Sequence, residues 1–192
     1  MNRALRATLV LAALVAGGCA SGPIGQYQSS LEIQMAVRSA ALGSASVGEF
    51  TVAPTLAAAA DQSVSVRGHR LSSPVDNSFA QYLRGAMLTE LRTAGLLAES
   101  TPVVISGRLT DNRLDAGGTT KASGELGAEF SVTAAGKLVY SKPVKVRSDW
   151  AASFMGAIAI PEAINQYTAL YRKLLAALFA DEEFRKALQP AG

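Results

Sequence analysis

The spacing of apolar residues along the chain predicts two clear helices. In residues 79–94 apolar side chains recur every three or four positions, which is typical of a helix with one buried face. Gly95 follows as a natural C-terminal cap. Pro161 suits the first turn of a last helix, whose apolar stripe is Ile164, Tyr167, Leu170, Tyr171, Leu174 and Leu178. A further turn starting at Asp181 carries Phe184 and Leu188.

Alternating apolar and polar residues predict strands between and before these helices. The expected strands are residues 47–52, 63–67, 102–109, 126–132 and 138–150. Pro143 interrupts the last of them and favours an edge strand or a bulge. Segments rich in turn-forming residues are expected to connect the strands: a loop over 68–74, a turn or long hairpin tip over 111–120 and a tight turn over 135–137.

The resulting order, β-(β)-α-β-β-β-α, predicts the α+β class. Each helix has one apolar stripe and each strand one apolar face, so the economical arrangement places both helices on one face of a sheet. We expect an antiparallel-rich sheet of about four to five strands. The side chains expected to meet in the core are Phe79, Leu83, Met87, Phe130, Leu170 and Leu174.

The first eighteen residues have the layout of a secretory signal peptide. Arg3 and Arg6 precede an uncharged apolar run over 7–16, and Gly17 and Gly18 then lead to Cys19, the only cysteine. The apolar run is shorter than the roughly 20 residues that a spanning helix needs. Because small residues lead directly into a cysteine, the segment resembles the lipobox of bacterial lipoproteins. Two other interpretations are a secreted protein with a buried free cysteine and a cytoplasmic protein with an apolar N-terminus.

The lipobox resemblance implies cleavage between Gly18 and Cys19 and acylation of Cys19, which would anchor the chain in a lipid bilayer. Ala16 stands where leucine is commonest. Ala20 is not the aspartate that retains such proteins in the inner membrane, which implies an outer-membrane anchor facing the periplasm. We therefore expect a signal peptide over 1–18, the lipidated cysteine, a tether and a short helix over 19–45, and a single periplasmic domain over 46–192.

The charge balance argues against nucleic acid as a partner. The chain has 18 basic and 15 acidic residues, and removal of Arg3 and Arg6 with the signal peptide leaves 16 basic residues beside the 15 acidic ones. No basic run stands out. With Cys19 lipidated, no thiol is left for a disulfide or a metal site, and no cofactor motif occurs.

Few residues suggest chemistry of their own. His69 is the only histidine and is expected in an exposed loop beside two arginines. Asp111, Asn112 and Asp115 lie near two glycines but miss the spacing of a calcium loop, so they predict a solvated turn. Glu125 and Glu129 share one face of a strand and are expected to face water.

The apolar segment over 153–160 has two interpretations. We expect it to be a loop buried under the terminal helix, in which case Ile158→Asp should unfold the domain. The alternative is an exposed patch that docks a partner or lipid through Phe154, Met155, Ile158 and Ile160.

The chain also resembles a known family. A strand over 47–52 before a long helix, the strand meander, Ser153-Phe154 and a closing segment from Asp181 to Phe184 resemble the YajG-type envelope lipoproteins. LptE, a lipopolysaccharide-assembly lipoprotein, has a similar element order. The YajG family has no defined activity to carry over. The lipid anchor, together with a domain that lacks a catalytic constellation, predicts a non-catalytic lipoprotein that binds or supports an unidentified envelope component. The alternatives are a hydrolase acting on cell wall or lipid and a lipid carrier with an apolar cavity.

Overall fold

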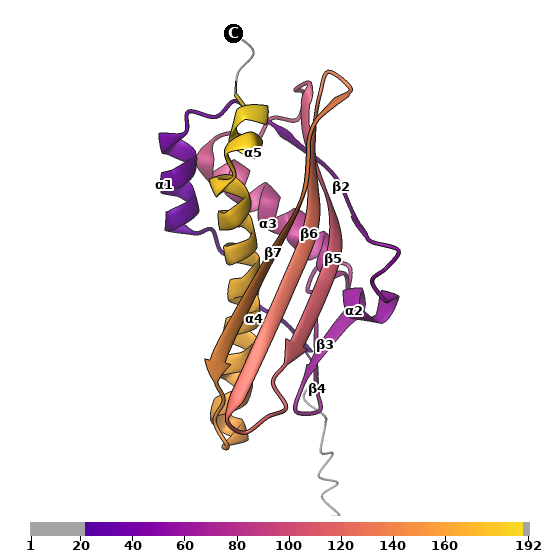
Figure 1. The fold of residues 1–192 in the computed structure, drawn as a ribbon, viewed down its shortest axis with the longest axis vertical. Helices are drawn as coiled ribbons and strands as arrows, with labels where there is room; N and C mark the ends of the chain where they lie inside the picture. Colours follow the sequence, from indigo (N-terminus) through magenta and orange to yellow (C-terminus); the bar gives the residue numbers. More distant parts are fainter. Residues whose placement is uncertain (1–21, 190–192) are drawn as a thin grey trace, which may run out of the picture.

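The computed structural model describes residues 22–189, which fold around a four-stranded sheet (Figure 1). Its strand order is β2-β5-β6-β7. β2 runs parallel to β5, and the remaining neighbours are antiparallel. The strands are β2 (Ser46–Val52), β5 (Val103–Asp115), β6 (Lys121–Ala134) and β7 (Lys137–Ala151).

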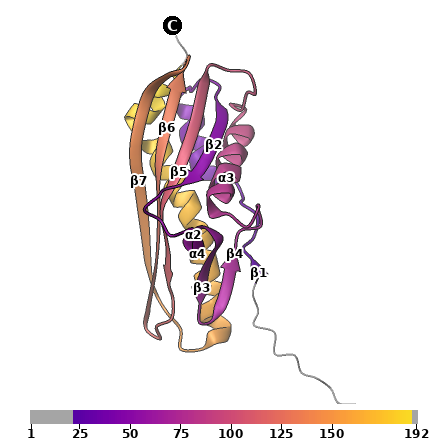
Figure 2. The same cartoon turned by 90° about the vertical axis from the view of Figure 1, so that its right-hand side faces the viewer.

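Two long helices cover one face of this sheet (Figure 2). They are α3 (Phe79–Ala94), which packs on β2 and β5, and α4 (Gly156–Ala180), which packs on β6 and β7. The predicted α+β class is confirmed. The expected core is also confirmed, since none of its side chains is exposed to solvent: Phe79, Leu83, Met87, Phe130, Leu170 and Leu174.

A second, smaller sheet corrects the loop expected over 68–74. Its strand order is β1-β4-β3, with β1 (Gly22–Pro23), β3 (Ser63–Val66) after the short helix α2 (Ala58–Gln62), and β4 (His69–Ser72). Arg67 and Gly68 both have positive φ, 49° and 82°. Two such residues form the tight turn that suits a two-residue hairpin. The turn reverses the chain, and Leu71 on β4 becomes buried.

The turn expected over 111–120 is wrong in its first half, because β5 continues to Asp115. Asn112 is buried there, with 3% of its surface exposed. Its amide donates to the Ala60 carbonyl at 2.7 Å, and its side-chain oxygen accepts from the Tyr167 hydroxyl at 2.7 Å. Asparagine is common in turns, but here hydrogen bonds to residues distant in sequence allow Asn112 to be buried within a strand.

The start of α4 corrects a second expectation. The segment over 153–160 is helical from Gly156 onward, and Pro161 lies inside the helix instead of in its first turn. The short helix α5 (Glu182–Ala187) follows as expected. The Asp181 side chain caps it by accepting from the Phe184 amide at 3.0 Å. No helix between Gly22 and Gln189 is long and apolar enough to cross a membrane.

The N-terminal part of the described chain belongs to the domain. The short helix expected near residue 31 is α1 (Leu31–Ser39). Residues 22–30, expected as tether, lie against the domain: Ile24 is 3% exposed and Tyr27 9%. The signal peptide, Gly18 and Cys19 lie outside the described residues.

Candidate binding surfaces

The outer face of the four-stranded sheet is polar because the strands alternate. On β6, Leu126, Phe130 and Val132 point inward and are fully buried, whereas Glu125 and Glu129 lie on the opposite, solvent-exposed face. The expectation that both glutamates face water holds for Glu129, whose side chain is 39% exposed, and only in part for Glu125, whose side chain is 16% exposed. The helices cover only the inner face, so the outer face is open to a partner.

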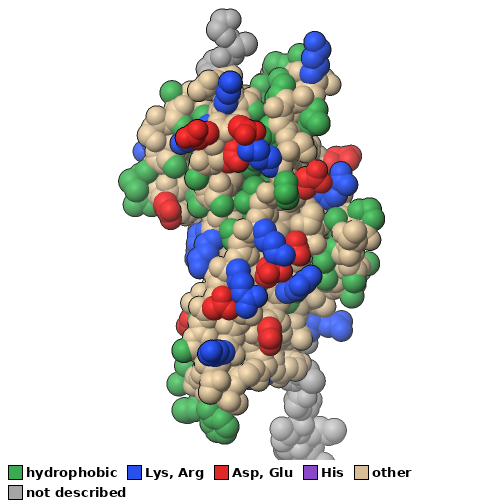
Figure 3. Space-filling view, viewed as in Figure 1, with side chains coloured by type: hydrophobic (Ala, Val, Ile, Leu, Met, Phe, Trp, Pro, Cys, Tyr) green, Lys and Arg blue, Asp and Glu red, His purple; other side chains and the backbone are tan. Residues whose placement is uncertain are grey.

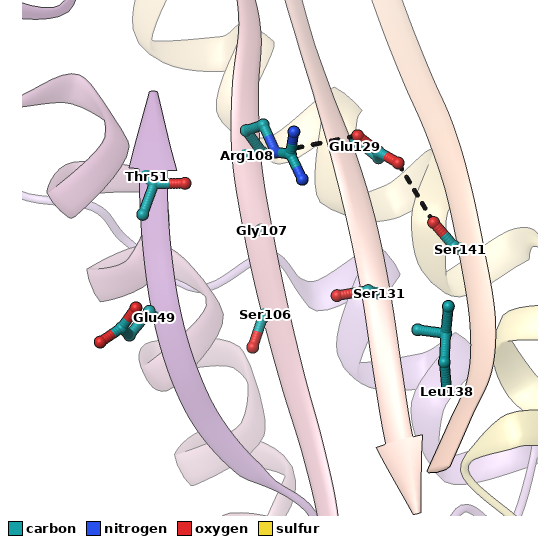
Figure 4. Close-up of a pocket in the computed structure, with 9 residues that line it drawn as sticks. All are labelled: Glu49, Thr51, Ser106, Gly107, Arg108, Glu129, Ser131, Leu138 and Ser141. Atoms are coloured by element: carbon teal, nitrogen blue, oxygen red, sulfur yellow. Dashed lines mark hydrogen bonds and ion pairs between the residues drawn. The ribbon is translucent and has the colours of Figure 1, made fainter. Parts of the chain in front are cut away.

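A shallow depression of about 420 Å³ lies on this outer face (Figure 4). Glu129 lies 3.9 Å from the Arg108 guanidinium and accepts from the Ser141 hydroxyl at 3.2 Å. Gly107 lies beneath it, and any side chain there would come within 2.5 Å of the Phe50 ring. The depression therefore presents hydroxyls and one ion pair on a tightly packed floor. The depression can form hydrogen bonds. However, its Ser141 hydroxyl donates to the Glu129 carboxylate, whereas a nucleophilic serine is usually activated by an imidazole.

Charges along the rest of the outer face are paired with one another. The Lys145 ammonium lies 3.1 Å from Asp111 and 2.9 Å from Glu125, and Arg113 lies 3.6 Å from Glu125. Blue and red side chains are interspersed across this view of the surface (Figure 3). Because positive and negative charges alternate, this face has no continuous positive potential that would attract a polyanion. Within residues 22–189, no three His, Cys, Asp or Glu side chains gather closely enough to hold a metal ion.

Of the residues that the sequence singled out for chemistry, Asp111 and Glu125 meet at Lys145, and the others lie apart from them. Asp111 joins the charged outer face, whereas Asn112 points into the core. His69 begins β4 and is partly buried, so the exposed loop expected for it is wrong. The structure therefore does not bring the acidic candidates and the histidine together into one site.

An exposed apolar tip lies at the N-terminal end of α4. We define the apolar tip as Phe154, Met155 and Ile158, which are 81%, 59% and 56% exposed. The expectation that this segment is buried under the terminal helix is wrong for these three residues. It holds in part for Ile160, which packs against the core. Positions 158 and 160 are two apart on a helix and therefore point to opposite sides.

Arg67 holds the backbone of the apolar tip in place. Its guanidinium donates to the Ser153 carbonyl at 2.6 Å, the Phe154 carbonyl at 3.1 Å and the Gly118 carbonyl at 2.8 Å. One cation thus joins the β3–β4 turn, the β5–β6 connection and the segment before α4. Sequence reasoning missed this role, because the three carbonyls come from segments far from Arg67 in the chain.

Other large apolar side chains are exposed at the opposite end of the molecule (Figure 1). Leu31 and Met35 on α1 are 75% and 59% exposed, and Leu138 and Val139 after the β6–β7 turn are 63% and 50% exposed. We call these four residues the distal apolar residues. Sequence reasoning missed them too, because a helix stripe does not show which of its members find a partner.

Comparisons with known proteins reveal similar folds only at low identity. No family model matches the chain, and no curated protein matches it. A Xanthomonas campestris protein of the family DUF330 has a TM-score of 0.49 and 12% identity, over 82% of this chain and 95% of that one. A minor lipoprotein from Acinetobacter baumannii has a TM-score of 0.41 and 12% identity, over 78% and 98%. Rare lipoprotein B from Shewanella oneidensis has a TM-score of 0.38 and 12% identity, over 69% and 92%.

Proposed function

We propose that this protein is a non-catalytic lipoprotein of the bacterial envelope, anchored through acylated Cys19, whose domain binds another envelope component. The observation that carries the proposal is the order of basic residues, apolar run, Gly17-Gly18 and Cys19 at the start of the chain. Only three peptide steps separate Cys19 from Gly22, the first described residue. Three residues span at most about 11 Å, so the domain would stand close to the bilayer.

The shape of the domain supports a role in binding. It is elongated along α4, whose 25 residues correspond to a length of about 37 Å. The distal apolar residues lie at one end of this axis and the apolar tip at the other (Figure 1). The distal apolar residues form two exposed pairs, one on α1 and one after the β6–β7 turn, and exposed apolar side chains are candidates for contact with a partner. We assign the distal end to the envelope partner.

The packing between α3 and α4 favours a binding protein over a lipid carrier. A carrier needs an apolar cavity, and the space between α3 and α4 is occupied by aromatic rings packed edge to face. The Tyr82 and Tyr171 rings are 4.7 Å apart, and the Phe79 and Tyr167 rings 5.5 Å apart. The hydrolase alternative needs a nucleophile beside a base, and in the shallow depression the Glu129 carboxylate already interacts with Arg108 and Ser141.

The anchor is tested by palmitate labelling and membrane fractionation of Cys19→Ser beside the native sequence. We expect labelled native protein in the outer membrane and an unlabelled, unprocessed Cys19→Ser precursor. Ala20→Asp is the matched control, since it keeps the cysteine and should redirect the labelled protein to the inner membrane. A Cys19→Ser variant that still carries palmitate would overturn the anchor.

A further inference from the structure

We propose that the apolar tip, Phe154, Met155 and Ile158, inserts into the surface of the same bilayer that holds Cys19. The inference rests on the proposed function, because it takes the bilayer position from the acylated cysteine. It assigns this surface to phospholipid and leaves the distal end to a protein partner.

The first observation is the direction in which the described chain begins. β1 is parallel to β4, with Gly22 opposite Leu71 and Pro23 opposite Ser72. Because the two strands are parallel, the chain before Gly22 points in the same direction as the chain from Leu71 back to His69 and the turn at Arg67. The three peptide steps to Cys19 cover at most about 11 Å, roughly the length of β4. The start of the described domain thus faces the end that carries the β3–β4 turn.

The second observation is that this turn contacts the apolar tip. Arg67 belongs to the turn and donates to the carbonyls of Ser153 and Phe154. The two segments therefore form one end of the molecule. The views agree, since β1, β3 and β4 lie in the same half of the domain as the beginning of α4 (Figures 1 and 2). An anchor reaching only about 11 Å from Gly22 would bring this end to the bilayer.

The third observation is the chemistry of this end. An aromatic ring, a thioether and a branched aliphatic side chain are exposed together, and a cluster of green side chains marks the lower end of the surface in Figure 3. Arg70 on β4 and Lys121, which begins β6 opposite Ala151, are exposed cations on the strands of this end, and Asp115 and Asp149 are exposed acids on the neighbouring strand ends. Exposed aromatic and long apolar side chains are typical of segments that rest in the headgroup region of a membrane, and the charges beside these are mixed in sign. The Arg67 hydrogen bonds occupy the backbone carbonyls of Ser153 and Phe154, which reduces the cost of moving them away from water.

The test uses the acylated protein reconstituted into vesicles of phosphatidylethanolamine and phosphatidylglycerol. Met155→Cys and Met35→Cys are labelled separately with an environment-sensitive fluorophore, while Cys19 is blocked by its own lipid. The two methionines are matched, because each is 59% exposed and they lie at opposite ends of the domain. Quenching is then measured with lipids that carry a nitroxide on the acyl chain.

We expect the probe at residue 155 to lose most of its fluorescence to the nitroxide lipids and the probe at residue 35 to lose almost none. Adding Phe154→Ser and Ile158→Ser should reduce the quenching at residue 155 several-fold, whereas Leu31→Ser should leave it unchanged.

Each contrary result has a distinct meaning. Acylated protein that joins the vesicles but shows equally weak quenching at both positions overturns the insertion of the tip and leaves the anchor standing. A blue-shifted but unquenched probe at residue 155 also overturns it, since protein and not lipid then covers the tip. Protein that carries no palmitate and stays free of the vesicles overturns the anchor, and the inference with it.

Discussion

The Tyr27 hydroxyl donates a 2.5 Å hydrogen bond to the carboxylate of Glu90, which is completely buried on α3. The same carboxylate accepts from the Ser29 hydroxyl at 2.9 Å, the Ser30 amide at 3.0 Å and the Gln34 side chain at 2.6 Å. A buried carboxylate is costly unless its oxygens are hydrogen-bonded. The segment that leads from β1 into α1 supplies these donors, so Glu90 fixes the start of the described chain to the helix layer.

Removing the Tyr27 hydroxyl should destabilise the fold. Tyr27→Phe leaves the buried Glu90 with one donor fewer, and we expect a loss of about 1.5–3 kcal/mol in the free energy of unfolding. Urea denaturation measures this loss. Tyr140→Phe is the matched control, because the buried Tyr140 hydroxyl has no hydrogen-bond partner among residues 22–189, and its removal should be neutral or stabilising. Equal losses in the two variants would contradict the role of Glu90.

The local sequence pattern predicts much of the arrangement of helices on the sheet. The α3 boundaries were predictable because their signals are local: Ser78 accepts from the Gln81 amide at the start, and Gly95 adopts φ 72° at the end. The core stripe was predictable for the same reason. The burial of Glu90 was not predictable, since a glutamate is rarely buried without partners, and the donors that make its burial tolerable lie some sixty residues away.

The candidate surfaces were only partly predictable. The segment over 153–160 was recognisable by its apolar composition, yet its exposure depends on where α4 begins and on Arg67, a contact 86 or 87 residues distant in the chain. The strand β4 was missed because a loop and a two-residue hairpin share the same turn-forming residues. For the apolar tip the deciding partner is distant in sequence, whereas for β4 it is the neighbouring strand β3.

Truncation of the core should be costly where the two helices meet the sheet. Leu83→Ala and Leu174→Ala each remove a fully buried side chain, and we expect losses of about 2–5 kcal/mol. Leu138→Ala is the control, since Leu138 is 63% exposed and should change stability by at most about 0.5 kcal/mol. Chemical denaturation compares the three variants. An unchanged midpoint in Leu174→Ala would contradict the packing of α4.

Alkaline pH should unfold the protein through its tyrosines. Burial raises the pKa of Tyr82 to about 12 and also raises the pKa of Tyr27, Tyr167 and Tyr171. In the unfolded chain a tyrosine titrates near 10. Above that pH the folded state binds more protons than the unfolded state, so stability is constant below about 10 and falls as the pH rises toward the folded values. Tyrosinate absorbance and circular dichroism should therefore change together. Ionisation of these tyrosines near pH 10 with an intact fold would contradict the burial.

A charge on the apolar tip should leave the fold intact, which reverses the expectation from the sequence alone. Ile158 is 56% exposed, so the carboxylate of Ile158→Asp stays in water, and we expect a change in stability of at most about 0.5 kcal/mol. Ala163→Asp is the matched change on the buried side of α4, where Ala163 has no exposed surface. There the carboxylate loses its hydration without gaining a partner, and the domain should unfold. Thermal denaturation of the two variants distinguishes the exposed side of α4 from its buried side. Loss of the cooperative unfolding transition in Ile158→Asp would mean that the apolar tip belongs to the core.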